Sequence, residues 1–215
     1  ALQGNADITG VADWSKASSW DGVLTLSGTN TAKQGPEWPA KVDGKIATRG
    51  SLYGGSWQLQ VPEISLDGNV KNNPLKARGQ ASGNAAGQWN IPDLKLSLGK
   101  NHLDVKGSLA DKWNLDTKIN APGLDGILPG LGGVIIGDVK LRGDLDAPEV
   151  QADLTARGVR WQKDLAIDNA VIKGKVTSGE QIKGDLSVVV RQLKQADLVI
   201  SQLTLDANGS EKKHT

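Results

Sequence analysis

The sequence contains no cysteine, no phenylalanine and no methionine, and it has a single tyrosine. The absence of cysteine excludes a disulfide framework, thiolate chemistry and thiolate-ligated zinc. An oxidising compartment stays possible, because a chain without thiols has nothing to mispair there. The large side chains are nearly confined to seven tryptophans, so apolar bulk comes mainly from Leu, Val, Ile and Ala. The 27 glycines favour many turns over a few long helices.

Charge of one sign and long apolar runs are also lacking. The 25 Lys and Arg residues balance 24 Asp and Glu residues without forming a basic block, so we expect no nucleic-acid partner. The most apolar run, at 126–137, is shorter than the roughly 20 residues of a spanning helix and is broken by Gly and Pro. The start, ALQGNADITG, lacks the features of a signal peptide, and the ending, SEKKHT, has no closing element. We expect a segment of a longer protein.

What the sequence does contain is alternation of apolar and polar residues with a period of two. Leu94, Leu96 and Leu98 share one parity, Leu103 and Val105 share another, and polar residues separate them. This pattern predicts strands with one dry face and one wet face. Counting such segments predicts about fifteen strands of roughly five to eight residues. Short connections predict an antiparallel meander.

Glycine motifs suggest where these strands end. Five dipeptides are typical of tight hairpin turns: Asp21-Gly22, Asp43-Gly44, Asp67-Gly68, Asp125-Gly126 and Asn208-Gly209. The pattern G-x-φ-x-φ/T-x-G, where φ is apolar, occurs at 22–28, 44–50 and 137–143 and predicts short strands bounded by glycine turns. In the segments at 57–66 and 89–98 the apolar parity flips at a Pro-acid pair, Pro62-Glu63 and Pro92-Asp93, which predicts a bulge or a corner.

A Lys or Arg precedes Gly seven times, and two interpretations stay open. The tripeptides end at Gly50, Gly79, Gly107, Gly143, Gly158, Gly174 and Gly184. As a structural device, an outward basic residue discourages edge-to-edge aggregation. As a functional device, a row of such charges at the rim of a groove would meet phosphate headgroups.

These patterns predict an all-β fold, an elongated, curved, mostly antiparallel sheet. Its dry face can be hidden in a closed barrel or sandwich, or in a trough that a ligand completes. Small branched side chains without Phe or Met fill a wide interior poorly, which favours the trough. We expect one segment over 1–215, with at most one short helix near 121–133 and a possible subdivision near 121–136.

No residue pattern indicates an enzyme. His102 and His214 have no second histidine or carboxylate at zinc-ligand spacing, and the acidic segment GDLDAPEVQAD has too few ligands for a calcium loop. Nucleophile and phosphate-binding motifs are absent. We therefore expect no catalytic residue, no cofactor and no metal site.

The succession of motifs resembles a known family. LRGDLDAPEVQADLTARGVRW at 141–161, the preceding L-P-G-L-x-G segment and the glycine-bounded strands look like the TamB family of AsmA-like proteins, which are similar to bridge-like lipid transfer proteins. The resemblance implies an internal or C-terminal part of a periplasmic hydrophobic β-groove (β-taco), in a protein anchored in the bacterial inner membrane. It further implies phospholipid transport between the inner and outer membranes, a TamA-like outer-membrane barrel partner, and help in assembling autotransporters and other outer-membrane proteins.

On this interpretation, acyl chains of phospholipids lie against a wall that continues into the remaining β-groove segments of the same chain. The residues expected to line the wall are Leu94, Leu96, Leu98, Leu103, Val105, Val139, Leu141, Leu186, Val188, Val190, Leu203 and Leu205. Two alternatives remain. One is a chaperone or scaffold that pairs with outer-membrane strands by β-augmentation, and the other is a structural sandwich or solenoid with a filled core.

Overall fold

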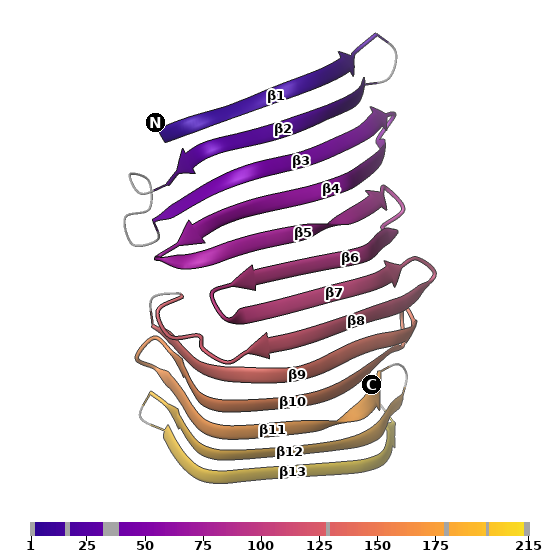
Figure 1. Cartoon of the computed structure of the whole chain (residues 1–215). Helices are drawn as coiled ribbons and strands as arrows, with labels where there is room; N and C mark the ends of the chain where they lie inside the picture. Colours follow the sequence, from indigo (N-terminus) through magenta and orange to yellow (C-terminus); the bar gives the residue numbers. More distant parts are fainter. Residues whose placement is uncertain are drawn as a thin grey trace. The chain divides into compact units, whose positions relative to one another are not determined.

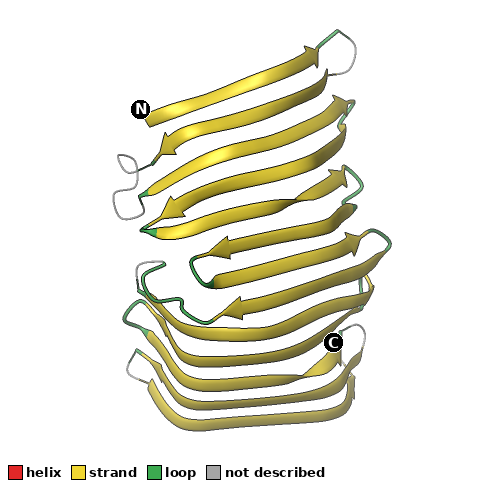
Figure 2. Cartoon of the chain, in the orientation of Figure 1, coloured by secondary structure: helices red, strands yellow, loops and turns green. Residues whose placement is uncertain are grey.

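The computed structural model describes residues 3–15, 18–31, 39–127, 130–178, 181–196 and 198–212. Over these residues the chain forms thirteen strands and no helix (Figure 2). The strands follow one another in the sheet in the order in which they occur in the sequence. The expected all-β antiparallel meander is therefore confirmed.

The chain divides into two compact units, of which unit 1 comprises Ala1–Gly99 and Asp104–Ala110 and unit 2 comprises the rest. The strands of unit 1 are β1 (Gln3–Asp13), β2 (Ser18–Asn30), β3 (Ala40–Tyr53), β4 (Ser56–Val70), β5 (Asn73–Asn84), β6 (Trp89–Leu98) and most of β7 (Asn101–Leu109). Antiparallel pairing joins β1 through β6 in succession.

Unit 2 contains the start of β7 and six further strands. These are β8 (Lys112–Ala121), β9 (Leu131–Asp144), β10 (Pro148–Trp161), β11 (Leu165–Thr177), β12 (Gln181–Gln195) and β13 (Leu198–Lys212). Each of β8 to β12 pairs antiparallel with the next strand. Strands β9 to β13 turn at both ends in the same direction, so that they form a trough (Figure 1).

The described residues form thirteen strands where the sequence predicts about fifteen, so they contain fewer hairpin turns than expected. The β3–β4 turn consists of Gly54 and Gly55, and the β4–β5 turn of Lys71 and Asn72, all with positive φ. Two-residue loops of this kind match the right-handed twist of the flanking strands. Between 121 and 133, the described residues form a turn at 125–127 and no helix.

Most of the predicted glycine turns are wrong. Of the five turn dipeptides, Asp21-Gly22, Asp43-Gly44, Asp67-Gly68 and Asn208-Gly209 lie inside strands, and only Asp125-Gly126 lies in a turn. The G-x-φ-x-φ/T-x-G segments likewise lie within longer strands. The predicted strands of five to eight residues are therefore too short, since the observed ones have 9 to 15 residues. The physical reason is that the glycines of these four dipeptides are paired with neighbouring strands, Gly44 and Gly209 with a positive φ, so that none of them reverses the chain.

The predicted bulges are confirmed. The register between β4 and β5 shifts between Val61 and Ile64, at the Pro62-Glu63 pair. In β6, the residues paired with β5 jump from Asn90 to Asp93, across Pro92. Each bulge returns the apolar residues that follow it to the same face of the sheet as those that precede it.

Candidate functional site

The candidate site of unit 2 is one face of its sheet. Residues that are opposite each other in neighbouring antiparallel strands lie on the same face, so the printed registers define rows that cross the strands. One row, from β8 to β13, is Ile119, Gly137, Leu154, Ile172, Val188 and Leu205. The flanking rows on this face are also made of Leu, Val, Ile, Ala and Gly, with one threonine, Thr117.

These rows place the predicted wall residues of unit 2. Val139 and Leu141 of β9, Leu186, Val188 and Val190 of β12, and Leu203 and Leu205 of β13 all lie on this apolar face. Leu103, in the part of β7 that belongs to unit 2, is half-buried between the exposed residues His102 and Asp104. The alternation in the sequence therefore predicts correctly that the named residues of β9, β12 and β13 share a face. That acyl chains of lipids lie against this face stays a prediction.

Unit 1 has an apolar face of the same kind. Leu94, Leu96 and Leu98 of β6 lie opposite Gly79, Ala77 and Leu75 of β5. These β5 residues in turn lie opposite Ile64, Leu66 and Gly68 of β4. The predicted residue Val105 is half-buried in the part of β7 that belongs to unit 1.

The predicted wall omits many of the apolar-face residues. Among those missed are Leu24, Leu26, Val42, Ile46, Leu59, Val61, Ile64, Leu66 and Leu75 in unit 1 and Leu115, Ile119, Ile135, Val150, Leu154, Ile172 and Val176 in unit 2. Several of them stand in strands interrupted by a bulge or by an in-strand glycine. The same period-two count finds them once it is restarted after each bulge.

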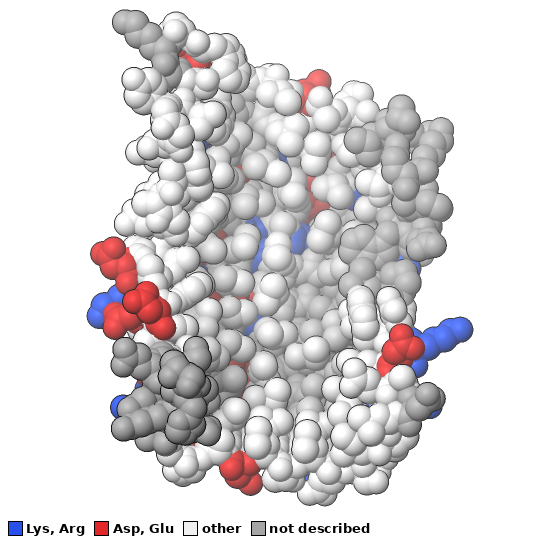
Figure 3. Space-filling view, turned by 180° about the vertical axis from the view of Figure 1, so that it is seen from behind, with Lys and Arg blue, Asp and Glu red and all other residues white. Residues whose placement is uncertain are grey.

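Nothing among the described residues covers these faces. Among the described apolar side chains, only Val70, Ala77, Ala121, Ile127 and Ala170 reach an exposure of 9% or less, and none is below 2%. A sandwich with a filled core would bury many large side chains completely. The described residues contain no second layer, so the filled-core alternative is wrong. In the space-filling view the surface over the strands is mostly white, and charged side chains gather mainly at its margins (Figure 3).

Glycines on the apolar face allow the strands to bend toward it. Gly137, Gly174 and Gly184 have positive φ within strands, at 147°, 155° and 150°. A Cβ atom added at Gly137 would collide with the main-chain oxygen of Asp153, and one at Gly174 would collide with that of Asp185. On the inner side of a bend, neighbouring backbones approach too closely for any side chain.

The opposite face of each unit is polar and held by ion pairs. In unit 2, the Arg142 guanidinium donates to the main-chain oxygens of Leu115 and Leu141, both at 2.8 Å, and to Asp116 at 2.5 Å. In unit 1, Arg78 contacts the Leu66 and Ala77 oxygens at 2.6 and 2.9 Å and pairs with Asp67.

Both arginines precede the glycine of the repeated tripeptide, and both tie their strand to a Leu-Asp pair of the neighbouring strand. Weaker pairs join Arg49 to Asp21 at 3.8 Å and Lys173 to Asp153 at 3.9 Å. These contacts support the structural interpretation of the basic residue before glycine at four of its seven positions, because the charge there already has an acidic partner on the polar face.

Tryptophans lie near the strand ends. Trp57 and Trp89 pack with ring centroids 5.8 Å apart, and the Trp20 indole donates to Thr48 Oγ1 at 3.2 Å. The buried Trp113 indole nitrogen has no hydrogen-bond partner among the described residues. Trp38, one of the seven tryptophans of the chain, lies outside the described residues.

The described residues carry no cluster of three or more potential metal ligands. His102 is exposed on β7, and His214 lies outside the described residues. No helix in the described part of the chain is long and apolar enough to cross a membrane.

The class of protein that these observations define is a β-groove protein, in which each unit is an open antiparallel sheet with one apolar face and one charged face. The family model described as "TamB, N-terminal domain" matches residues 1–215. The translocation and assembly module subunit TamB of Haemophilus influenzae is 31% identical over 215 residues, which is 100% of this chain and 16% of that protein. The chain therefore belongs to the TamB family.

A second relative extends the comparison. An uncharacterized protein of Buchnera aphidicola is 23% identical over 173 residues, which cover 80% of this chain and 18% of that protein. The chain thus spans less than a fifth of the length of either relative. No solved structure matches it.

Proposed function

We propose that the apolar faces of the two units shield the acyl chains of phospholipids that move between the inner and outer membranes. The observation that carries the proposal is a wide apolar face that no described residue covers, in a chain of the TamB family. Soluble proteins rarely expose contiguous apolar surface on this scale unless something binds there. Headgroups would stay in water beyond the margins of the face.

For a lipid to move along it, the wall must bind acyl chains with a similar free energy at every position. Burying a methylene group is worth about 0.8 kcal/mol, so a 16-carbon chain gains on the order of 10 kcal/mol before entropic costs. A lipid moves along such a wall only when successive positions are about equally favourable. The rows over β9 to β13 meet this requirement, because they consist of Leu, Val, Ile, Ala and Gly and contain no polar side chain that would hold a lipid at one position.

The proposal also covers the setting of this segment. We place it in the periplasm, as part of a longer protein anchored in the inner membrane, where further β-groove segments of the same chain continue the wall. Its partner at the other end would be a TamA-like outer-membrane barrel protein. Assembly of outer-membrane proteins such as autotransporters would be a second activity of the whole protein.

The decisive experiment is photo-crosslinking in living cells with the full-length protein. A photoreactive residue at Leu96 lies on the apolar face, whereas one at the neighbouring Lys95 lies on the polar face. We expect phospholipid to be captured at Leu96 and not at Lys95. Equal capture at both positions, or none at Leu96 in a functional protein, would contradict the proposal.

A scaffold that acts by β-augmentation is the second candidate, and one observation favours it. Among the described residues of β1, the Ile8 and Val11 side chains are 81% and 76% exposed. If this activity dominates, a proline at whichever of Ile8 and Thr9 directs its N–H away from β2 should abolish function, because it removes a hydrogen-bond donor that an added strand would use. Leu96→Asp should then have little effect, which is the reverse of the groove prediction.

A further inference from the structure

The polar face of unit 1 contains two adjoining hollows that the lipid-groove function does not use. The larger, of about 420 Å³, is lined by residues of β4 to β7, and the smaller, of about 270 Å³, by residues of β2 to β4. Gln58 and Gln60 of β4 line both hollows. We call the two together the polar furrow.

The furrow runs across the strands because its residues stand opposite one another in the sheet. One row is Asp21, Arg49, Gln60, Ser82 and Asn90, and a parallel row is Ser51, Gln58 and Asn84. From β2 to β6 the first row covers four strand spacings of about 4.8 Å, or roughly 19 Å.

Three register shifts lie beside the first row, one in each of three successive strand pairs. They fall between Ala47 and Arg49, between Val61 and Ile64, and between Gln80 and Ser82. Bulges re-aim the side chains next to them and are frequent beside functional sites. Because the three bulges lie next to the same row, the furrow runs across the strands.

The lining of the larger hollow is uncharged, in contrast to the rest of the polar face. None of its residues is Lys, Arg, Asp or Glu, whereas 23% of the whole chain is charged. At the β2–β3 end of the furrow, Asp21 and Arg49 pair with each other at 3.8 Å. A ligand with a net charge would therefore find no uncompensated opposite charge here.

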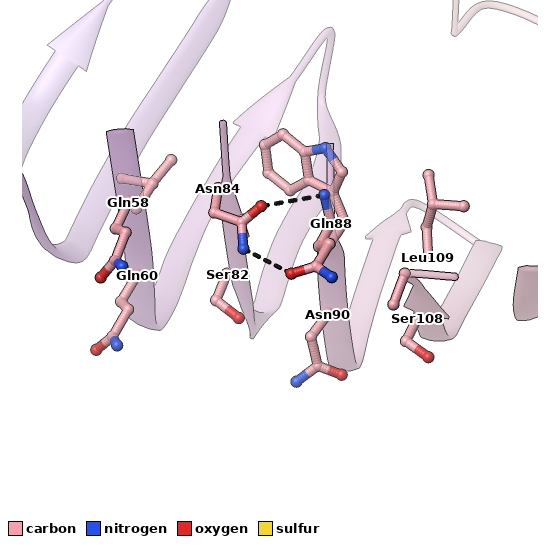
Figure 4. Close-up of a pocket in the computed structure, with 12 residues that line it drawn as sticks. Gln58, Gln60, Ser82, Asn84, Gln88, Asn90, Ser108 and Leu109 are labelled. Atoms are coloured by element: carbon pink, nitrogen blue, oxygen red, sulfur yellow. Dashed lines mark hydrogen bonds between the residues drawn. The ribbon is translucent and has the colours of Figure 1, made fainter. Parts of the chain in front are cut away.

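Most of the polar side chains that line the larger hollow make no hydrogen bond to another side chain or main-chain group of the described residues. Asn84 bonds to Gln88, with Nδ2 donating to Oε1 at 2.8 Å. By contrast, the side chains of Gln58, Gln60, Ser82 and Asn90 make no hydrogen bond to another described residue. These side chains and Ser108 project to the same side of the sheet, while Leu109 points to the other side (Figure 4).

We propose that the polar furrow binds an uncharged glycan chain. Amide and hydroxyl side chains both donate and accept hydrogen bonds, which complements the hydroxyl and acetamido groups of a neutral sugar polymer. A site elongated across several strands suits a linear polymer better than a compact ligand. A peptide is disfavoured, because the backbone beneath the furrow is already paired within the sheet and offers no edge for strand addition.

Isothermal titration of the full-length protein with chitotetraose, a neutral N-acetylated tetrasaccharide, tests the proposal. We expect saturable binding that the double substitution Gln60→Ala/Asn90→Ala weakens by at least about tenfold, since two hydrogen-bonding side chains are removed. The matched control is Asn114→Ala/Gln151→Ala, which removes one residue of each type from the polar face of unit 2 and should leave the affinity unchanged.

Saturation-transfer NMR on the wild-type protein gives a second readout that does not depend on the variants folding. We expect transfer to the acetamido and hydroxyl-bearing protons of the bound sugar. The absence of both saturable binding and transfer at millimolar sugar would overturn the proposal. So would equal weakening by the control variant, or tighter binding of a sulfated tetrasaccharide or of an uncharged Gln/Ser-rich peptide. The site lies on the face opposite the proposed lipid wall, so neither result depends on lipid binding.

Discussion

At the residue scale, glycine in this chain replaces the side chain that a bent strand cannot accommodate. Gly137, Gly174 and Gly184 lie on the apolar face, where the neighbouring main chain occupies the space of a Cβ atom. Gly209 also has a positive φ, of 124°, but no heavy atom lies within 4 Å of its missing Cβ. Comparing a substitution at Gly137 with one at Gly209 therefore separates the free-energy cost of a steric collision with the neighbouring strand from the free-energy cost of a positive φ.

We therefore predict that Gly137→Ala destabilises the protein much more than Gly209→Ala does. Both substitutions carry the strain of a positive φ, of about 1 to 2 kcal/mol. Only Gly137→Ala adds a collision with the Asp153 oxygen. Urea unfolding followed by circular dichroism measures the difference. Similar losses in the two variants would show that the bend does not require the absence of a side chain.

Arginine before glycine has a role that can be tested separately. Arg142 donates to two main-chain oxygens and to Asp116, and its side chain is 35% exposed. We predict that Arg142→Lys lowers the free energy of unfolding by about 1 to 2 kcal/mol, because an ammonium group cannot reproduce the guanidinium fork.

Lys140→Ala, on the same face of β9, is the control and should change stability by less than about 0.5 kcal/mol. Photo-crosslinking of lipid on the apolar face should be unchanged in Arg142→Lys. A loss of lipid capture without a loss of stability would instead indicate that this arginine meets headgroups.

At the element scale, the bulge in β4 keeps a long strand in register with both neighbours. Pro62 and Glu63 stand against the single residue Gln80 of β5, and Val61 and Pro62 stand against Thr48 of β3. Removing one residue therefore makes both ladders regular. In the native chain the bulge absorbs this extra residue and keeps Val61 and Ile64 on one face, whereas in the shortened strand regular alternation does so without a bulge.

We predict that deletion of Pro62 preserves the fold and changes the free energy of unfolding by no more than about 1 kcal/mol. Deletion of Ser65, three positions further along the same strand, should prevent folding, because it turns Leu66 and every later residue of β4 to the wrong face. Soluble yield and circular dichroism distinguish the two deletions. Equal tolerance of both would refute the register argument.

At the scale of the whole molecule, the proposed movement of lipid depends on the uncovered apolar faces as a whole and not on any single contact. If lipid reaches the faces of both units, one charge on either wall should act as a barrier. A buried carboxylate without a partner costs several kcal/mol, and each 1.4 kcal/mol corresponds to a factor of ten.

We predict that Leu96→Asp in unit 1 lowers the capture of phospholipid by a photoreactive residue at Leu186 in unit 2 by at least about tenfold. Lys95→Asp introduces the same charge on the polar face and should leave capture at Leu186 unchanged. In vivo crosslinking with the full-length protein measures both. Undiminished capture in Leu96→Asp would show that lipid reaches unit 2 without passing residue 96.

The sequence by itself determined that the chain is all-β, that its strands run antiparallel in chain order, and which leucines share a face. These properties follow from the period-two pattern and from short connections, which are local. The Pro-acid pairs also predict their bulges locally, because parity flips within a few residues. The resemblance to the family, too, follows from a succession of short motifs, above all the stretch at 141–161.

Only the tertiary structure decided what the glycines do and whether the dry face is covered. An Asp-Gly pair such as Asp43-Gly44 looks the same in the sequence whether it forms a hairpin turn or lies in a bent strand. The close approach of the Ser65 main chain on the next strand shows that this pair lies in a bent strand. The rows of Gln60, Ser82 and Asn90 likewise exist only through the register of three strands. Such properties depend on residues that are distant in the sequence, and no local pattern contains them.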